Sequence, residues 1–158
     1  MLTLLLNAAL AAPQWTIQVD PLTAALGFPH LQVERVLAES WSVYAGPHAR
    51  LFDGLLSEEP EPFLGVGLEA GVRYYWAGRA PEGGWLLARG VGAYAWRTDT
   101  DASSPSGYGS LLAGYTGILG EWLVLSGGAG GQYIRYGVDD LGTKGFFPAL
   151  HTAVGVAL

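Results

Sequence analysis

The chain has 158 residues, which fits one domain able to bury a core unaided, and it has no cysteine, which excludes disulfides, thiolate chemistry and cysteine-ligated zinc. Half of the residues are hydrophobic, 14% are charged and 24 are glycine, an apolar composition for a soluble domain. The net charge is −6 and Lys144 is the only lysine, so the chain lacks a basic patch and we expect no nucleic-acid partner.

Residues 1–12, MLTLLLNAALAA, form an apolar run that is shorter than the ~18–20 residues of a membrane-spanning helix. The run contains Ala9-Leu10-Ala11 and is followed by Pro13, a pattern typical of a short or truncated signal peptide. The alternative is an ordinary apolar start to the first strand. We predict that residues 13–158 form a single β-barrel domain.

Clusters of Gly, Pro, Asn, Asp and Ser divide the rest of the chain into about eight strands. We expect these strands near residues 14–26, 30–38, 41–53, 63–77, 84–98, 107–119, 122–136 and 146–158. Most of them have at least the ~9–11 residues that a tilted strand needs to cross a bilayer. The predicted fold is therefore all-β: an eight-stranded antiparallel up-and-down transmembrane β-barrel of the outer-membrane type.

Alternation of bulky and small residues indicates which face of each strand points outward. In residues 63–76 the bulky face carries Leu64, Val66, Leu68, Ala70, Val72, Tyr74 and Trp76, and the other face carries Gly65, Gly67, Glu69, Gly71, Arg73 and Tyr75. A narrow barrel has room inside only for filling side chains, whereas the solvated face of a soluble sandwich is seldom so rich in glycine. Residues 146–158 repeat the pattern, so we expect bulk outside and small residues inside.

The connections between the predicted strands alternate in length, as transmembrane barrels alternate short periplasmic turns with longer external loops. Short turns are expected at Glu39-Ser40 and Gly120-Glu121. The short segment Gly27-Phe28-Pro29 and the longer segment 78–84 depart from the alternation. Longer polar loops are expected at residues 53–62, 98–107 and 137–145, which hold many of the acids and form the expected contact surface for a ligand or protein.

Aromatic residues gather at the ends of the predicted strands. Transmembrane barrels carry such girdles at both interfaces, because an indole or phenol places an apolar body beside a polar tip. The alternative is that these residues cap the edges of an ordinary sheet. The predicted girdle comprises Trp15, Trp41, Trp76, Trp85, Trp96, Trp122 and Tyr136.

Several short segments resemble the DUF3575-like family of small Gram-negative outer-membrane barrels, within the wider OmpA/OmpX-like group. They are Asp20-Pro21-Leu22, Leu31-Gln32-Val33-Glu34-Arg35, Gly71-Val72-Arg73-Tyr74-Tyr75, and Phe147-Pro148-Ala149-Leu150 with Val154-Gly155-Val156. The resemblance spans residues 14–158 and implies a barrel in the bacterial outer membrane. It implies no specific activity, because the family is largely uncharacterised.

Ionisable residues on the predicted inward face point to a polar lumen. A charge inside a small barrel is costly unless it is paired, so opposite charges there should form a hydrogen-bonded network. We predict a polar plug, with a gated proton or ion path as the alternative, because about eight strands leave too little space for an open pore. The predicted network comprises Glu34, His48, Arg50, Glu69, Arg73 and Arg89.

No residue pattern predicts catalysis, a metal or a cofactor. His151 is a candidate for the Ser/His/acid arrangement of a lipid-modifying enzyme, but no serine stands near it in its strand. The glycine-rich segment 127–131 lacks the Lys-Ser/Thr of a P-loop. Asp139-Asp140 and Asp99-x-Asp101 fall short of the ~6–8 oxygens of a calcium site.

The sequence therefore predicts an outer-membrane barrel with a structural or interaction role, a polar plugged lumen, acidic external loops and the lipid bilayer as its partner. One alternative is a soluble lipocalin-like barrel that binds a small apolar ligand, which would need bulky apolar residues inside. The other alternative is an outer-membrane lipid-modifying enzyme.

Overall fold

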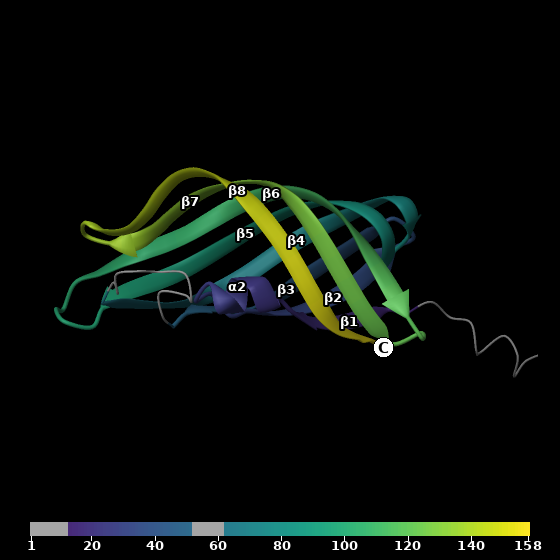
Figure 1. The fold of residues 1–158 in the computed structure, drawn as a ribbon, viewed down its shortest axis with the longest axis horizontal. Coiled ribbons are helices and arrows are strands. Elements are labelled where there is room, and N and C mark those ends of the chain that lie inside the picture. Colours follow the sequence, from purple (N-terminus) through teal and green to yellow (C-terminus); the bar gives the residue numbers. More distant parts are fainter. Residues whose placement is uncertain (1–12, 52–61) are drawn as a thin grey trace, which may run out of the picture.

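The computed structural model describes residues 13–51 and 62–158, and these form a closed barrel of eight antiparallel strands (Figure 1). Each strand pairs with the next one along the chain, and the last pairs back with the first. The predicted eight-stranded antiparallel barrel is thus confirmed, while the predicted signal peptide at residues 1–12 lies outside the described residues. The strands are β1 (Trp15–Val19), β2 (Leu31–Ala38), β3 (Trp41–Arg50), β4 (Phe63–Arg79), β5 (Glu82–Arg97), β6 (Ser103–Leu119), β7 (Leu123–Val138) and β8 (Leu141–Ala157).

The two ends of the barrel differ. At the end on the right of Figure 1, which we call the terminal end, Gln14 donates its backbone N–H to the carbonyl of Leu158 at 3.0 Å. The tight turns between β2 and β3, β4 and β5, and β6 and β7 lie at this end as well. The opposite end, which we call the loop end, carries the β1–β2, β5–β6 and β7–β8 connections.

Two of the three predicted long loops are shorter than expected. β6 begins at Ser103, so the loop predicted at 98–107 is reduced to 98–102, and β7 and β8 leave only Asp139-Asp140 of the loop predicted at 137–145. The glycines that suggested turns lie inside a continuous ladder, as at the Gly137↔Gly142 pair, because glycine weakens a strand without ending its hydrogen bonding. The loop predicted at 53–62 lies outside the described residues, apart from Pro62.

The segment predicted as a longer connection at 78–84 is also a tight turn. β4 runs to Arg79 and β5 begins at Glu82, so Ala80-Pro81 alone joins them. Gly78 and Gly83 face each other in this hairpin with φ angles of 93° and 122°, values that strongly favour glycine. The terminal end therefore carries uniformly short turns.

The prediction of a first strand over residues 14–26 is wrong after Val19, where a short helix, α2 (Pro21–Ala25), begins. Asp20 caps this helix, since its carboxylate accepts the backbone N–H groups of Leu22 and Thr23 at 3.0 Å. Proline at the first helical position has the φ angle that a helix needs. The β1–β2 connection is therefore residues 20–30, and not the short turn expected at 27–29.

The same carboxylate fastens α2 to the barrel wall. Strand pairing between β1 and β8 stops at Val19↔Val154. Beyond that point Asp20 accepts a hydrogen bond from the backbone N–H of Thr152 at 3.1 Å and another from its hydroxyl at 2.6 Å. Asp20 thus replaces the ladder where β1 ends, and α2 lies beside β8. Within the described residues, no helix is both long and apolar enough to cross a membrane.

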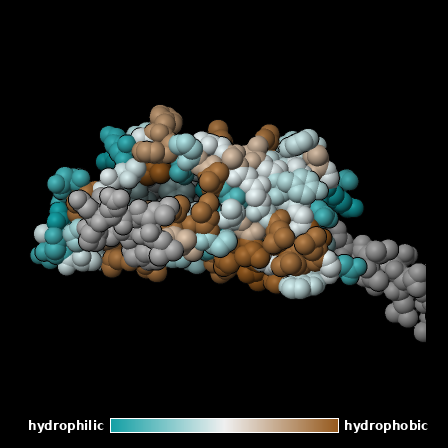
Figure 2. Space-filling model, in the orientation of Figure 1, coloured by the Kyte–Doolittle hydropathy of each residue, from teal (hydrophilic) through white to brown (hydrophobic). Residues whose placement is uncertain are grey.

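Apolar side chains cover the outside of the barrel and polar ones fill its inside. On β4, Leu68 is 71% exposed whereas its neighbour Glu69 is 1% exposed; on β8, Phe146 is 84% exposed and His151 is 1% exposed. Figure 2 shows hydrophilic residues mainly at the two ends of the long axis, with most of the hydrophobic residues between them. The burial pattern therefore has the orientation expected for residues 63–76 and for most of 146–158; Phe147, expected on the inward face, is 39% exposed.

Inward-facing glycines make room for the aromatic side chains that fill the lumen. A Cβ atom added at Gly71 would lie 2.4 Å from the ring of Tyr44, and one added at Gly128 would lie 2.5 Å from the ring of Trp85. At Gly131, on the outer face of β7, an added Cβ would have nothing within 4 Å. The small residues of the inner face are thus complementary in shape to large ones from other strands.

We expect Gly71→Ala to destabilise the barrel, because the new methyl group would overlap the ring of Tyr44, whose hydroxyl is held at 2.8 Å by Glu69. Overpacking of this kind costs about 1–3 kcal/mol in the free energy of unfolding, which urea titration of the chain folded in detergent micelles would measure. The matched Gly131→Ala variant should change this free energy by less than ~0.5 kcal/mol. Equal losses in the two variants would contradict the proposed packing.

Candidate functional site

The candidate site is the polar lumen. All six residues of the network predicted from the sequence are buried there, together with Asp20. Among the described residues, the buried charged side chains comprise three carboxylates and three guanidinium groups, whose charges balance, as a low-dielectric interior requires. They are Asp20, Glu34 and Glu69, with Arg50, Arg73 and Arg89.

Glu34 on β2 organises the half of the lumen nearer the terminal end. Arg73 on β4 forms an ion pair with it at 2.9 Å, and both side chains are almost wholly buried. Hydroxyl and amide groups complete the shell, so that protein donors take the place of water around the carboxylate. The other donors are Tyr75 at 3.0 Å, Thr16 at 3.1 Å, Gln18 at 3.0 Å and Ser42.

Trp85, predicted to belong to the girdle, lies instead inside this half of the lumen and is fully buried. Its indole N–H donates to Thr116 at 2.9 Å, its ring lies 4.8 Å from the guanidinium carbon of Arg73, and the ring of His151 lies 5.5 Å away. The inward position of Trp85 could be predicted from the sequence, because Trp85 is an even number of residues from Arg89 on one strand and so shares its inward face.

Tyr136 is the second correction to the predicted girdle, because it is also buried in the lumen. Its ring packs 5.5 Å from Phe28 and 5.8 Å from His48, and its hydroxyl lies over Gly65. The girdle residues that do face outward at the terminal end are exposed, and Trp96, near the loop end, is half-buried. Those at the terminal end are Trp15, Trp41, Trp76 and Trp122.

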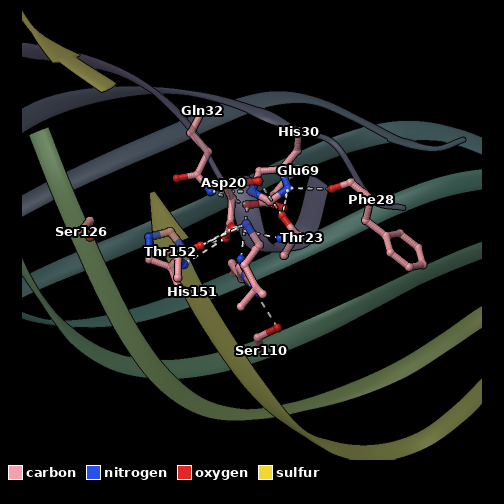
Figure 3. A network of polar contacts seen from close by, with 12 residues as sticks. Asp20, Thr23, Phe28, His30, Gln32, Glu69, Ser110, Ser126, His151 and Thr152 are labelled. Carbon is pink, nitrogen blue, oxygen red and sulfur yellow. Dashed lines mark hydrogen bonds and ion pairs between the residues drawn. The ribbon is translucent and has the colours of Figure 1, made fainter. Parts of the chain in front are cut away.

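Glu69 on β4 organises the half of the lumen nearer the loop end. It accepts hydrogen bonds from Tyr44 at 2.8 Å, from Gln32 at 3.2 Å and from Tyr108 at 3.3 Å. Arg89 lies farther away, with Nη1 3.8 Å from Oε1, so this ion pair is looser than that of Glu34. Figure 3 shows Gln32, His30 and Glu69 close together in this region.

His30 is a lumen residue that the sequence analysis missed. It pairs directly with His48 in an isolated bridge just before β2, and it is buried. Its Nδ1 lies 3.2 Å from the hydroxyl of Thr23 on α2, and its Nε2 lies 3.0 Å from Nε2 of Gln32. Alternation along the strand predicted at 30–38 identifies it, because His30 and Glu34 are four residues apart and so fall on one face.

Apolar side chains close the lumen on both sides of these polar layers. Toward the loop end, Phe63, Ala95, Tyr136 and Val138 form one cluster, and Arg50 places its guanidinium carbon 3.5 Å from the centre of the Phe63 ring. A second cluster reaches the terminal end through Tyr75, Ala80 and Trp85. Within the described residues, the barrel is therefore plugged by its own side chains.

Acidic side chains at the loop end are exposed and weakly organised. Arg97, at the end of β5, donates two hydrogen bonds to Asp99 at 2.8 and 2.7 Å, and this holds the pKa of the Asp99 carboxyl below its usual value. The same guanidinium lies 3.7 Å from Asp140 in the β7–β8 turn. Because exposed ion pairs contribute little to stability, these contacts leave the acids available to a partner.

The described neighbours of His151 hold its imidazole in place inside the lumen and do not form a catalytic triad. Its Nδ1 lies 3.8 Å from the Asp20 carboxylate and its Nε2 lies 3.5 Å from Arg73. Among the described residues, no serine hydroxyl makes a hydrogen bond with it, and a nucleophile–base contact is the first requirement of such an enzyme. The imidazole therefore fills the lumen beside Trp85.

Comparison with protein-family models, with curated proteins and with solved structures finds no match to this chain. The resemblance to small outer-membrane barrels remains a prediction from the short segments that suggested it. The functional argument accordingly rests on the chain's own geometry.

We expect Glu34→Gln to lower the free energy of unfolding by about 3–5 kcal/mol, because it leaves Arg73 as a buried charge without its counter-ion. Urea unfolding in detergent micelles measures the effect, and Glu121→Gln in the exposed β6–β7 turn is the control. The double variant Glu34→Gln, Arg73→Gln should lose less than the sum of the two single variants. Additive losses would show that the two residues do not act as a pair.

Proposed function

We propose that this chain is a transmembrane barrel of the bacterial outer membrane, with a plugged lumen and a structural or interaction role. The observation that carries the proposal is the inverted distribution of side chains: large apolar residues point outward and charged residues point inward. In water, exposed apolar surface of this extent is unfavourable, whereas lipid solvates it. A closed barrel also leaves no unpaired strand edge to face lipid.

The exposed aromatic residues support this proposal. Four tryptophans mark the terminal end, and the ring of Trp41 lies 4.8 Å from that of Tyr74 on the neighbouring strand. Near the loop end, Tyr94 is exposed and its hydroxyl lies 2.6 Å from that of Ser103. Exposed aromatic residues near both ends of an apolar outer face are typical of barrels whose ends lie at the two interfaces of a bilayer.

The orientation we propose places the terminal end in the periplasm and the loop end outside. Short turns at one end and longer connections at the other are typical of outer-membrane barrels. At the loop end the β1–β2 and β5–β6 connections are longer than the turns of the terminal end, while the β7–β8 turn is as short as they are. The external face would then present α2, residues 98–102 and the Asp139-Asp140 turn. We infer that any specific contact with a ligand or a protein uses this surface, because the plugged lumen offers no open passage.

The two alternative functions receive less support. A lipocalin-like carrier needs an apolar interior, but the inward faces of these strands carry charged and amide side chains. A lipid-modifying enzyme needs an activated nucleophile, and the contacts of His151 to Asp20 and Arg73 do not supply one.

The test is a charge placed on the outer face. Leu111, near the middle of β6, is 70% exposed, and a lysine there should cost about 2–4 kcal/mol in a lipid bilayer. Unfolding of Leu111→Lys in liposomes would measure this cost against Thr100→Lys, in the exposed connection at the loop end, which should be nearly neutral. If Leu111→Lys were also neutral and made the chain soluble without detergent, the membrane assignment would be wrong.

A further inference from the structure

His48 presents an unsatisfied pair of polar atoms. The residue lies on the inner face of β3 and is 2% exposed, yet neither ring nitrogen has a hydrogen-bond partner among the described residues. A buried polar group without a partner is destabilising, and the large majority of buried polar side-chain atoms have a partner. The position therefore calls for a hydrogen-bond partner or a bound ion that residues 13–51 and 62–158 do not supply.

The aromatic rings around His48 pack against its imidazole but give its two nitrogens no hydrogen bond. Phe28, Tyr108 and Tyr136 surround it with ring centres at 5.9, 5.6 and 5.8 Å. The hydroxyl of Tyr136 is itself buried without a partner, and that of Tyr108 donates to Glu69. These aromatic groups shield the imidazole from water and leave its lone pair available.

Two further metal-binding side chains converge on the same point. His30 is the cross-strand partner of His48, and Glu69 lies on β4, where it pairs with Gly46 two residues before His48. One ligand atom from each of His30, His48 and Glu69 can be chosen so that all lie within 4.8 Å of one another. Zinc–nitrogen and zinc–oxygen bonds of ~2.0–2.2 Å in a tetrahedral site place the ligand atoms roughly 3.3–3.6 Å apart. The three side chains must therefore close in by about 1 Å when one ion binds.

We propose that the lumen binds one divalent transition-metal ion, of the class of Zn²⁺, through His30, His48 and Glu69. Two imidazoles and one carboxylate form a ligand set suited to zinc and to its first-row neighbours, and not to the all-oxygen preference of Ca²⁺ or Mg²⁺. The amide nitrogen of Gln32 lies 3.0 Å from Nε2 of His30 and 3.2 Å from Oε1 of Glu69. A half-turn of this amide would free Nε2 of His30 and bring the buried, unpartnered Oε1 of Gln32 to a fourth position on the ion.

Neighbouring groups orient the ligands. Nδ1 of His30 lies 3.4 Å from the carbonyl of Phe28, which only accepts hydrogen bonds; this favours a proton on Nδ1 and leaves Nε2 as the ligand atom. The hydroxyls of Tyr44 and Tyr108 hold the Glu69 carboxylate in place. Arg89, 3.8 Å from Glu69, repels a cation, so the loose ion pair must open slightly when the metal binds.

The experiment uses the full, untagged chain folded in detergent micelles, with Zn²⁺ titrated by calorimetry and Co²⁺ followed by its visible absorption. We expect one ion per chain and the intense Co²⁺ bands of a four-coordinate site. His48→Gln should weaken Zn²⁺ binding by about tenfold or more, since even the loss of an orienting neighbour costs ~10–100-fold. His151→Gln is the matched control, because it removes an equally buried histidine outside the cluster.

Absence of Zn²⁺ binding by the wild-type chain would overturn the proposal, as would unchanged affinity in His48→Gln or an equal loss in His151→Gln. Circular dichroism checks that each variant folds, and His30→Gln serves if His48→Gln does not. Because the measurement needs only the folded barrel, its outcome is independent of whether the chain resides in a membrane.

Discussion

A closed ring of eight strands encloses a lumen only wide enough for side chains, and this steric limit governs the rest of the molecule. Every inward position must be filled without overlap, so aromatic rings such as those of Tyr44 and Trp85 lie over glycines on other strands. Many bulky aliphatic side chains, such as Leu68 and Leu111, are directed outward, while a few, such as Leu87 and Leu112, help to fill the lumen. The polar interior and the apolar exterior are two results of the same constraint.

Charges inside such a lumen are stable only as closed networks. Glu34 and Glu69 each gather donors from several strands, so the networks also tie together segments far apart in the sequence. Asp20 performs the same task at the seam, where it caps α2 and binds Thr152 on β8. The buried acids therefore contribute to closing the barrel as well as to filling it.

Much of this arrangement could be predicted from the sequence, because alternation along a strand assigns each residue to a face. Residues an even number of positions apart on a strand share a face, and this rule correctly places Glu69 and Arg73 on the buried face. Applied to Trp85 and Arg89, the same rule places Trp85 inside the barrel and not in the girdle. The same rule places His30 on the inward face with Glu34, whereas its direct pairing with His48 is a contact between strands that alternation alone does not reveal. The α2 helix was missed because its few residues are specified by Asp20 and Pro21 and not by a helical repeat.

Strand ends were the least predictable feature, since glycine and serine suggest turns locally while the neighbouring strand decides whether pairing continues. The β7–β8 hairpin extends to Val138 and Leu141 for this reason. Its length brings the Asp139-Asp140 turn and residues 98–102 to one end of the molecule, where Arg97 contacts both. The acidic surface at the loop end is thus a product of strand pairing and not of long loops.

In the proposed membrane barrel, lipid would cover the outer face. The most direct test of this proposal is electrophoretic mobility in SDS, with and without heating, of the chain recovered from the outer-membrane fraction of a Gram-negative host. A closed barrel inserted in lipid should stay folded in unheated SDS and change mobility only after heating. Recovery as a water-soluble monomer, or the same mobility before and after heating, would contradict the account.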